Sequence, residues 1–425
     1  MRSLPAILAL MALSCFPGAR AEETTARESI LKKGQRVAVV GDSITEQKLY
    51  SKYIELYLIA CLPQLDLHVI QLGWGGETAR GFLGRMNNDL LPWKPDVVTT
   101  CYGMNDGGYR AFDENIGKNY AGPMAEIVGR LKKAGATVVV GGPGVVDSKF
   151  FQGGGEKPKI YNDNLSHLSQ LAKKLADAEG FPFADVFGTM HQAMEKSKPV
   201  LGEAYDVGGT DGVHPGPNGH LLMAYAFLKA MGIDGQIGAI TIDLRGKAAA
   251  SEGHKITGEE TGKVELESSR YPFCFSGDDK SPKGTRSILP YVPFNADLNR
   301  LTLVVKNLDG AKAKVTWGAA SKTFSKEDLE KGINLAAEFQ ENPFAEPFRK
   351  LESMIGAKQA LETGMIKAVI NQFPRTVDAM GKDKAVEASI EALRKQMFET
   401  HEKLDASVRS ALLPVKHTIT VAVEK

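Results

Sequence analysis

The chain has 425 residues, of which 43% are hydrophobic and 24% are charged, and its formal net charge is +1. This length and composition are typical of a globular protein with two domains, because one hydrophobic core seldom grows past roughly 250–300 residues. The near balance of acidic and basic residues gives no electrostatic reason to expect nucleic acid or an anionic membrane as the main partner.

The N-terminus has the three-part pattern of a cleavable secretory signal peptide. A basic residue, Arg2, precedes a short apolar run that ends at Leu13, and a small-residue site ends at Ala21. The run is shorter than the about 20 apolar residues that a membrane-spanning helix needs. We therefore expect residues 1–21 to be cleaved off after Ala21 and the protein to be secreted or periplasmic. Lipid modification of Cys15 is an alternative, although the residue three positions earlier is alanine rather than the usual leucine.

Three cysteines remain after such a cleavage, namely Cys61, Cys101 and Cys274. Their number is odd, their spacings are wide and no two form a CxxC pair, so they indicate neither a disulfide framework nor a metal cluster. Cys61 and Cys101 lie in apolar contexts, where a buried structural thiol is the usual finding. We expect no cofactor and no metal.

Short apolar runs alternate with amphipathic stretches from residue 36 to about residue 232. The strand candidates are Arg36–Val40, Leu67–Leu72, Val97–Cys101, Thr137–Gly141 and Phe181–Asp185. The helix candidates are Leu49–Ala60, Phe82–Leu90, Ala121–Lys133, Ile160–Glu179, Thr189–Ser197 and Asn218–Met231. Repeated strand–helix–strand units imply a parallel sheet with helices on both faces. Such sheets bind ligands beyond the carboxyl ends of their strands, so functional residues should follow the strands directly.

After Gly235 the pattern changes to strands that are linked by polar and glycine-rich stretches. A segment from about Lys326 to Leu412, rich in Ala, Glu, Lys and Leu, has helical spacing, and an alternating segment from His417 to Val423 predicts a final strand. We interpret this as a smaller α+β region whose sheet includes the C-terminal strand. The predicted organisation is a signal peptide (1–21), a parallel-sheet α/β domain (28–234) and a β-rich, then helical, accessory region (235–425).

Ser43 follows the first predicted strand directly, in the segment Gly41-Asp42-Ser43-Ile44-Thr45. A serine at a strand-to-helix turn can be exposed, with backbone N–H groups of the next helix directed toward it, as a nucleophile requires. A serine at this place can also be no more than a helix N-cap, and this segment alone favours the cap.

Two further segments follow the second and third predicted strands and could stabilise an oxyanion. The segment Gly73-Trp74-Gly75-Gly76 has three glycines in four residues, which allows its backbone to present N–H groups to a ligand. Asn105, in Gly103-Met104-Asn105-Asp106, carries a side-chain amide that could donate a hydrogen bond. Taken separately, the two segments could be a flexible loop and an ordinary turn.

Asp211 and His214 lie three residues apart just before the last helix candidate of this part. On a constrained loop the carboxylate can bind one imidazole nitrogen, which leaves the other nitrogen to act as a general base. A metal pair or a structural hydrogen bond is the alternative, but the other histidines have no metal-ligand spacing. Together the four segments supply a nucleophile, two kinds of oxyanion donor, a base and the carboxylate that orients it.

In this order the four segments resemble the sequence blocks of the SGNH (GDSL-type) hydrolases, over about half of the chain. The resemblance implies a three-layer α/β/α flavodoxin-like domain with five parallel strands. It also implies that Ser43 is the nucleophile and that His214 is the base, oriented by Asp211. The oxyanion hole would consist of the backbone N–H groups of Ser43 and Gly76 and the side chain of Asn105.

These observations predict a secreted serine esterase that acts on small-molecule or glycan esters. Asp42, Trp74, Tyr102 and Tyr109 lie beside the predicted catalytic segments and are candidates for substrate binding, since aromatic rings suit both sugar rings and acyl chains. Relatives that act on acetylated glycans favour short-acyl, chiefly acetyl, esters on carbohydrate. A lysophospholipase or thioesterase, or a non-catalytic glycan-binding protein, is the alternative.

Overall fold

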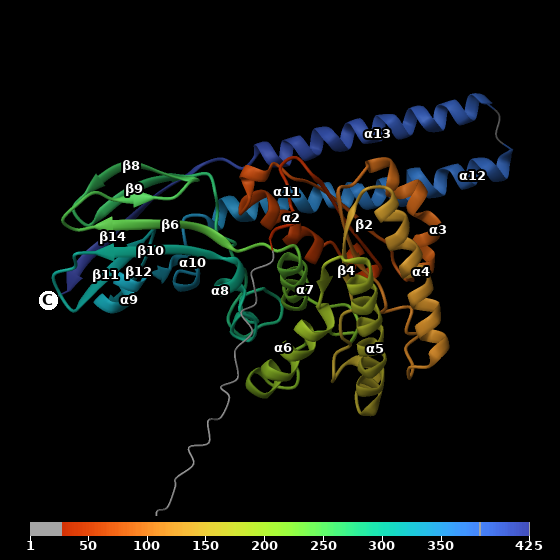
Figure 1. The fold of residues 1–425 in the computed structure, drawn as a ribbon, viewed down its shortest axis with the longest axis horizontal. Coiled ribbons are helices and arrows are strands. Elements are labelled where there is room, and N and C mark those ends of the chain that lie inside the picture. The colour runs from red at the N-terminus through yellow and green to blue at the C-terminus, as the bar shows by residue number, and fades with distance from the viewer. Residues whose placement is uncertain (1–27, 382–383, 425) are drawn as a thin grey trace, which may run out of the picture.

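The computed structural model describes residues 28–381 and 384–424, so the predicted signal peptide and Cys15 lie outside the described residues. The described chain is elongated, with a helix-covered parallel sheet toward one end and two further sheets toward the other (Figure 1). A long helix, α13 (Lys384–Ser410), runs along one side (Figure 1). Among the described residues no helix combines the length and the apolar character needed to cross a membrane.

The first part of the chain forms a five-stranded parallel sheet. Its strands are β1 (Arg36–Gly41), β2 (His68–Gly73), β3 (Val97–Cys101), β4 (Thr137–Gly141) and β5 (Phe183–Ala184), in the spatial order β2-β1-β3-β4-β5. Apart from Arg36, His68 and Gln71, the residues of the first four are small, apolar or β-branched, and almost all are buried, as in strands with both faces covered. The predicted α/β fold with five parallel strands is therefore confirmed.

Helices cover both faces of this sheet. They are α1 (Ser43–Glu46), α2 (Tyr50–Ala60), α3 (Ala79–Asp89), α4 (Glu114–Lys133), α5 (Glu156–Glu179), α6 (Val186–Leu201) and α7 (Pro217–Ala230). Alternate residues of β1 enter different cores: Val37 and Val39 pack with α2 and α7, and Ala38 and Val40 pack with α3 and α4. Because all five strands run the same way, their carboxyl ends, and the loops that follow them, gather at one edge.

The remaining chain contributes two more sheets and the final helices. A four-stranded sheet has the order β13-β10-β6-β7, and a five-stranded antiparallel sheet has the order β12-β11-β14-β9-β8. The strands are β6 (Gln236–Asp243), β7 (Ala249–Ala250), β8 (His254–Glu260), β9 (Lys263–Ser268), β10 (Arg300–Lys306), β11 (Lys312–Trp317), β12 (Ala320–Ser325), β13 (Ile333–Asn334) and β14 (Val415–Glu424). As predicted, the C-terminal strand belongs to a sheet; β14 lies between β9 and β11.

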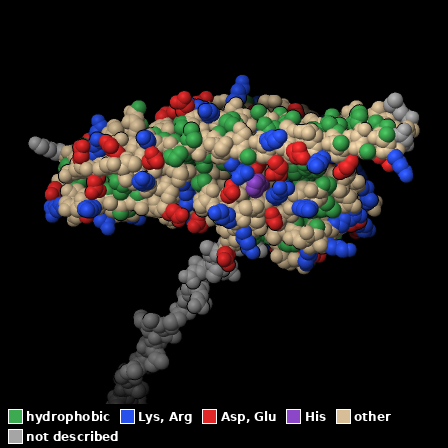
Figure 2. Space-filling view, turned by 90° about the horizontal axis from the view of Figure 1, so that it is seen from above, with side chains coloured by type: hydrophobic (Ala, Val, Ile, Leu, Met, Phe, Trp, Pro, Cys, Tyr) green, Lys and Arg blue, Asp and Glu red, His purple; other side chains and the backbone are tan. Residues whose placement is uncertain are grey.

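The helices of this second part are short, except for those near the C-terminus. They are α8 (Phe294–Leu298), α9 (Lys326–Lys331), α10 (Leu335–Glu338), α11 (Ala345–Gly364), the π-helix η5 (Met365–Gln372), α12 (Phe373–Met380) and α13; short 3-10 turns lie at Pro63–Leu65 (η1), Leu91–Trp93 (η2), Phe151–Gly153 (η3) and Leu289–Tyr291 (η4). Figure 2, which looks onto the side that carries α13, shows acidic and basic side chains interspersed. Neither sign of charge dominates this face.

A row of hydrogen bonds connects the two accessory sheets. The indole nitrogen of Trp317 can only donate a hydrogen bond, so the acceptor is Nδ1 of His417, at 3.1 Å. The proton of His417 is then on Nε2, which donates to Ser268 Oγ at 2.8 Å. Ser268 in turn donates to His254 Nδ1 at 2.8 Å, since His254 Nε2 donates to the carbonyl of Ile237 at 3.2 Å. Both histidines are therefore held in the neutral state, and burial lowers the pKa of each.

Helix α11 covers β2, the edge strand of the parallel sheet. Lys358 Nζ donates to the carbonyl of Val69 at 2.5 Å, and the N–H of Gln71 donates to Glu362 Oε2 at 3.0 Å. These side chains satisfy outward-facing backbone groups that an open sheet edge would leave unpaired. The helical part of the accessory region is thereby attached to the first sheet by polar contacts as well as by packing.

Candidate active site

The turn after β1 presents Ser43 as the first residue of α1. The backbone enters the turn at Asp42, whose carboxylate accepts a hydrogen bond from the Ile44 N–H at 2.9 Å and caps the helix. Asp42 is buried, and this burial raises its pKa to about 7. Ser43 itself is partly exposed. The buried carboxylate of Asp42 therefore holds the turn in place, and the serine beside it remains accessible to solvent.

Ser43, His214 and Asp211 form a continuous hydrogen-bonded row. The hydroxyl of Ser43 lies 2.8 Å from His214 Nε2, and His214 Nδ1 lies 2.7 Å from Asp211 Oδ2. The other oxygen of Asp211 accepts the backbone N–H groups of Val213 and His214, each at 2.8 Å. Partial burial acts against ionisation, yet these hydrogen bonds hold the pKa of Asp211 below its ordinary value. This is the geometry of a nucleophile, a base and an orienting carboxylate.

The loop that carries Asp211 and His214 is held by Asp147, in the segment after β4. This buried carboxylate accepts the N–H of Val207 at 3.0 Å and pairs with the buried ammonium of Lys198 at 2.9 Å. Gly212 has φ +84°, and a Cβ there would lie 2.3 Å from the backbone of Phe151, so only glycine fits. Sequence reasoning missed Asp147 and Lys198; the available signal was the position of Asp147 after a strand.

The three glycines of the loop after β2 differ in whether their N–H groups have partners among the described residues. The N–H of Gly73 donates to Gln71 Oε1 at 2.8 Å, and that of Gly75 donates to Glu46 Oε2 at 2.5 Å. The N–H of Gly76, at φ +70°, donates to no atom of the residues that the structure describes. Of the three glycines, Gly76 is the one whose N–H can reach a ligand.

Asn105 lies beside this loop with a fixed amide. Its Nδ2 donates to the backbone carbonyl of Glu77 at 3.0 Å, and its Oδ1 accepts the hydroxyl proton of Tyr109 at 2.8 Å. A primary amide carries two protons, so the second can be donated to an oxyanion. The structure thus gathers Ser43, Gly76 and Asn105 from three different loops at the carboxyl edge of the sheet.

Part of the chain matches a known protein family. Residues 39–222 match the model of the GDSL-like lipase/acylhydrolase family. These residues belong to the GDSL-type (SGNH) hydrolases. An acetylxylan esterase from Geobacillus stearothermophilus is 23% identical over 223 residues, which cover 47% of this chain and 95% of that protein. The GDSL-type domain identifies the protein as a carboxylic ester hydrolase.

The whole fold also has a solved counterpart. The structure of a gut microbial diltiazem-metabolizing enzyme aligns with a TM-score of 0.72 at 22% identity, and the alignment covers 93% of this chain and 99% of that one. A structure of the acetylxylan esterase Axe2 from Geobacillus stearothermophilus, a catalytic mutant, aligns over 48% of this chain with a TM-score of 0.40 and 21% identity. The first likeness shows that the accessory sheets and helices of this GDSL-type esterase belong to a fold found in another protein.

Asp106 connects the two loops of the candidate oxyanion hole and was not singled out from the sequence. Its Oδ1 accepts the N–H of Ala79, and its Oδ2 accepts the N–H of Gly103, both at 3.0 Å. Burial raises its pKa to about 6. Sequence reasoning treated this residue as part of a turn, because its partner at Ala79 is far away along the chain.

The four predicted substrate-binding residues differ in their exposure to solvent. Tyr102 is fully buried, stacks on Phe82 with ring centroids 5.6 Å apart and donates its hydroxyl proton to Glu77 at 2.9 Å. Asp42 is also buried and serves as the helix cap. In this structure both side chains are buried, at 3% exposure for Asp42 and 0% for Tyr102. Trp74 is partly exposed and Tyr109 is 37% exposed, and their contact with substrate stays a prediction.

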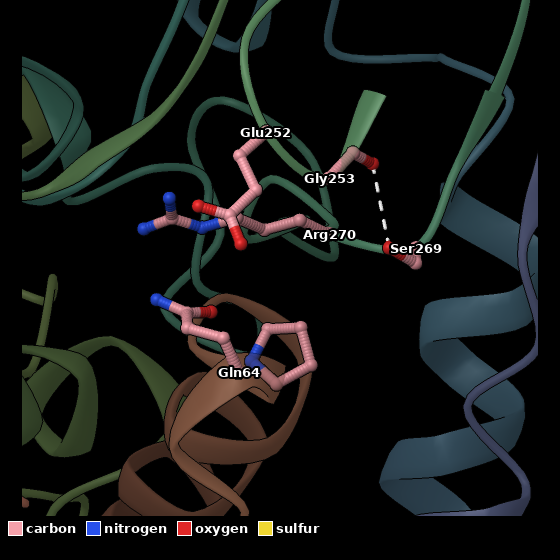
Figure 3. Close-up of a pocket in the computed structure, with 6 residues that line it drawn as sticks. Gln64, Glu252, Gly253, Ser269 and Arg270 are labelled. Carbon is pink, nitrogen blue, oxygen red and sulfur yellow. Dashed lines mark hydrogen bonds between the residues drawn. The ribbon is translucent and has the colours of Figure 1, made fainter. Parts of the chain in front are cut away.

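A cavity of about 430 Å³ lies away from these segments, where η1 meets the accessory region. Figure 3 shows Gln64, Glu252 and Arg270 around it. None of its lining residues belongs to the four segments of the esterase site.

Among the described residues, no group of three histidines, cysteines or carboxylates could hold a metal ion. Cys61, Cys101 and Cys274 are free thiols, and burial raises the pKa of each.

Proposed function

We propose that this esterase cleaves short-acyl esters through an acyl-enzyme formed on Ser43. The observation that carries the proposal is the row from Ser43 Oγ to His214 Nε2 (2.8 Å) and from His214 Nδ1 to Asp211 Oδ2 (2.7 Å). Asp211 accepts the Nδ1 proton, so the lone pair of Nε2 faces Ser43. The base is therefore in the tautomer that can accept the hydroxyl proton.

Acylation begins when Ser43 Oγ attacks the ester carbonyl carbon and His214 Nε2 takes the hydroxyl proton. The new Oγ–C bond places the negative charge on the former carbonyl oxygen. The carbonyl then re-forms, the bond to the alcohol oxygen breaks, and His214 gives its proton to the departing alcohol. The product of this step is an ester of Ser43.

The oxyanion is stabilised by three donors from three loops: the N–H of Ser43, the N–H of Gly76 and the Nδ2–H of Asn105. The first N–H groups of a helix have no partner within the helix, which suits Ser43 to this role. In deacylation His214 takes a proton from water while the water oxygen attacks the acyl carbon. Ser43 leaves with that proton, and the carboxylic acid is released.

We propose acetyl esters of carbohydrate as the substrate class. An acetylxylan esterase is among the relatives of the domain, and the partly exposed rings of Trp74 and Tyr109 lie beside the site, where they could stack on a sugar. We also propose that residues 1–21 direct the protein out of the cytoplasm, that residues 28–234 form the catalytic domain and that residues 235–425 form its accessory region. Secretion suits an enzyme that meets polymeric glycan outside the cell.

The proposal is tested with p-nitrophenyl esters from acetate to octanoate and with acetylated xylo-oligosaccharides. Activity should be highest on acetate, and Ser43→Ala should abolish it. Ser269→Ala, which alters an exposed serine of the accessory region, should keep the wild-type rate. A preference for octanoate or for thioesters would instead support a lysophospholipase or a thioesterase. Folded protein that hydrolyses none of these substrates would refute the catalytic proposal.

A further inference from the structure

The C-terminal helices reach the loop that carries Gly76. Lys367 lies in the π-helix η5, and π-helical segments redirect side chains and are frequent at functional sites. Its ammonium lies 2.5 Å from Glu46 Oε1 and 5.1 Å from the centre of the Trp74 ring. A side chain more than 300 positions from Ser43 in the sequence thus contacts two segments of the esterase site.

Glu46 links this lysine to the oxyanion loop. It is the last residue of α1, the short helix that begins at Ser43. One of its carboxylate oxygens binds Lys367, and the other accepts the N–H of Gly75 at 2.5 Å. Because Gly75 directly precedes Gly76, a single carboxylate ties the nucleophile helix, the oxyanion loop and the accessory helix together.

A second row of contacts reaches the same loop from its other side. Asn371, also in η5, donates to both oxygens of Asp89 at 2.9 and 3.0 Å. Asp89 accepts a hydrogen bond from Arg85 at 3.0 Å, and Arg85 binds both oxygens of Glu77 at 2.6 Å. The π-helix therefore contacts, directly or through these pairs, the residues on both sides of Gly76.

We propose that Lys367 is a positioning residue of the oxyanion hole and that it acts through Glu46. The proposal rests on the proposed function, in which the Gly76 N–H binds the oxyanion. With Lys367 in place, the carboxylate of Glu46 is held toward Gly75 and fixes the direction of the next peptide. Without this ammonium, the half-buried carboxylate can turn to water, and the loop loses its anchor. The accessory region is then a part of the catalytic apparatus and more than a structural extension.

The size of the effect follows from the sensitivity of catalysis to donor placement. Loss of a whole oxyanion donor lowers kcat by about 100- to 1,000-fold, and a displacement of about 1 Å can cost about 100-fold. Lys367→Met displaces the Gly76 donor without removing it, so kcat should fall by about tenfold or more. KM should change by less than about twofold, because the ground-state ester does not depend on this hydrogen bond.

The test compares Lys367→Met, Lys367→Arg and Lys52→Met on p-nitrophenyl acetate, with thermal unfolding of each variant. Lys367→Arg keeps the cation and should recover most of kcat. Lys52→Met is the matched control, since Lys52 of α2 and Glu352 of α11, the helix that directly precedes η5, form a partly buried pair of 2.9 Å. It should leave kcat within about twofold of the wild type. If Lys367→Met fails to fold, Lys367→Gln takes its place.

A double-mutant cycle with Glu46→Gln separates positioning from general stability. Glu46→Gln should lower kcat by itself, and adding Lys367→Met should then lower it by less than about twofold further, because the lysine acts through Glu46. Full additivity, an unchanged kcat in Lys367→Met, or an equal loss in Lys52→Met would overturn the proposal. An inactive wild-type protein would refute the proposed function, and this proposal with it.

Discussion

Replacing Lys358 with methionine should destabilise the protein strongly and in a pH-dependent way. The ammonium of Lys358 is 1% exposed and lies 2.8 Å from Glu55, 3.0 Å from Glu362 and 3.6 Å from Asp405. Glu55 belongs to α2 of the catalytic part, whereas the other two acids belong to α11 and α13. The substitution leaves three buried carboxylates without their shared cation, at the contact between the parallel sheet and the C-terminal helices.

The magnitude follows from how the variant can relieve these charges. Removing one partner of a buried ion pair costs about 3–5 kcal/mol. Burial raises the pKa of Glu55 while Lys358 lowers it, so Glu55 should take up a proton when the ammonium is removed. Keeping a carboxyl protonated costs about 1.4 kcal/mol for each pH unit above its unfolded pKa of about 4.3, which gives about 5 kcal/mol at pH 8 and about 1 kcal/mol at pH 5.

The sign of the pH dependence is fixed by proton uptake. The folded variant binds more protons than the unfolded chain, so its stability falls as the pH rises. Urea unfolding of wild type and Lys358→Met at pH 5 and pH 8 should therefore give a loss of about 3–5 kcal/mol at pH 8 that shrinks toward about 1 kcal/mol at pH 5. Lys52→Met, which breaks the more exposed pair between the same two helices, should lose less than about 1 kcal/mol at both values. Equal losses at the two pH values would refute this reasoning.

Three further changes test other parts of the structure. Asn105→Ala should lower kcat on p-nitrophenyl acetate by about 100- to 1,000-fold, whereas Asn115→Ala, on the exposed side of α4, should not; equal rates would exclude Asn105 from the oxyanion hole. Lys198→Met leaves the buried carboxylate of Asp147 unpaired and should cost about 3–5 kcal/mol in urea unfolding, and a loss below 1 kcal/mol would contradict this. Burial lowers the pKa of His417 to about 4, so its neutral form stabilises the fold above pH 6.5 and this contribution is lost as the pH falls toward 4. Between pH 7 and pH 4.5 the wild type should therefore lose about 2–3 kcal/mol more than His417→Gln, and equal losses would argue against a neutral buried histidine.

The parallel sheet could be predicted because most of its strands are continuous runs of apolar and β-branched residues in the sequence. Continuous β-branched runs such as Val97–Cys101 and Thr137–Gly141 were predicted with the bounds that the structure has. The fifth strand is only two residues long, Phe183–Ala184, and its predicted length was wrong. Such a short strand is defined by its pairing with β4 rather than by its own sequence.

The attachment of the C-terminal helices could not be predicted, because it depends on charges that resemble a solvated helix face. Lys358 and Glu362 occur in a sequence rich in Lys, Glu and Ala, where the ordinary expectation is exposure to water. The structure instead buries both against β2 and Glu55. Whether such a charged residue is buried depends on an oppositely charged partner on a distant element, and that partner cannot be identified from the sequence alone.

Some residues of the candidate site could be predicted from the sequence, and others could not. Ser43, Asp211 and His214 could be predicted as a group because each lies in a short motif next to a strand or a helix, and the structure brings them within hydrogen-bonding distance. Asp106 and Asp147 were missed because they act on backbone N–H groups from remote loops. Residues that position a site through tertiary contacts have no characteristic spacing in the sequence by which they could be recognised.

The most direct test of the account is to find where the acyl group is carried during turnover. The protein is mixed with p-nitrophenyl acetate, quenched in acid and digested, and the acetylated peptide is identified by mass spectrometry. We predict a burst of p-nitrophenol and an acetyl group on Ser43, with both absent from Ser43→Ala. Hydrolysis by Ser43→Ala at the wild-type rate, or an acetyl group on another residue that turns over as fast, would contradict the assignment of Ser43 as nucleophile.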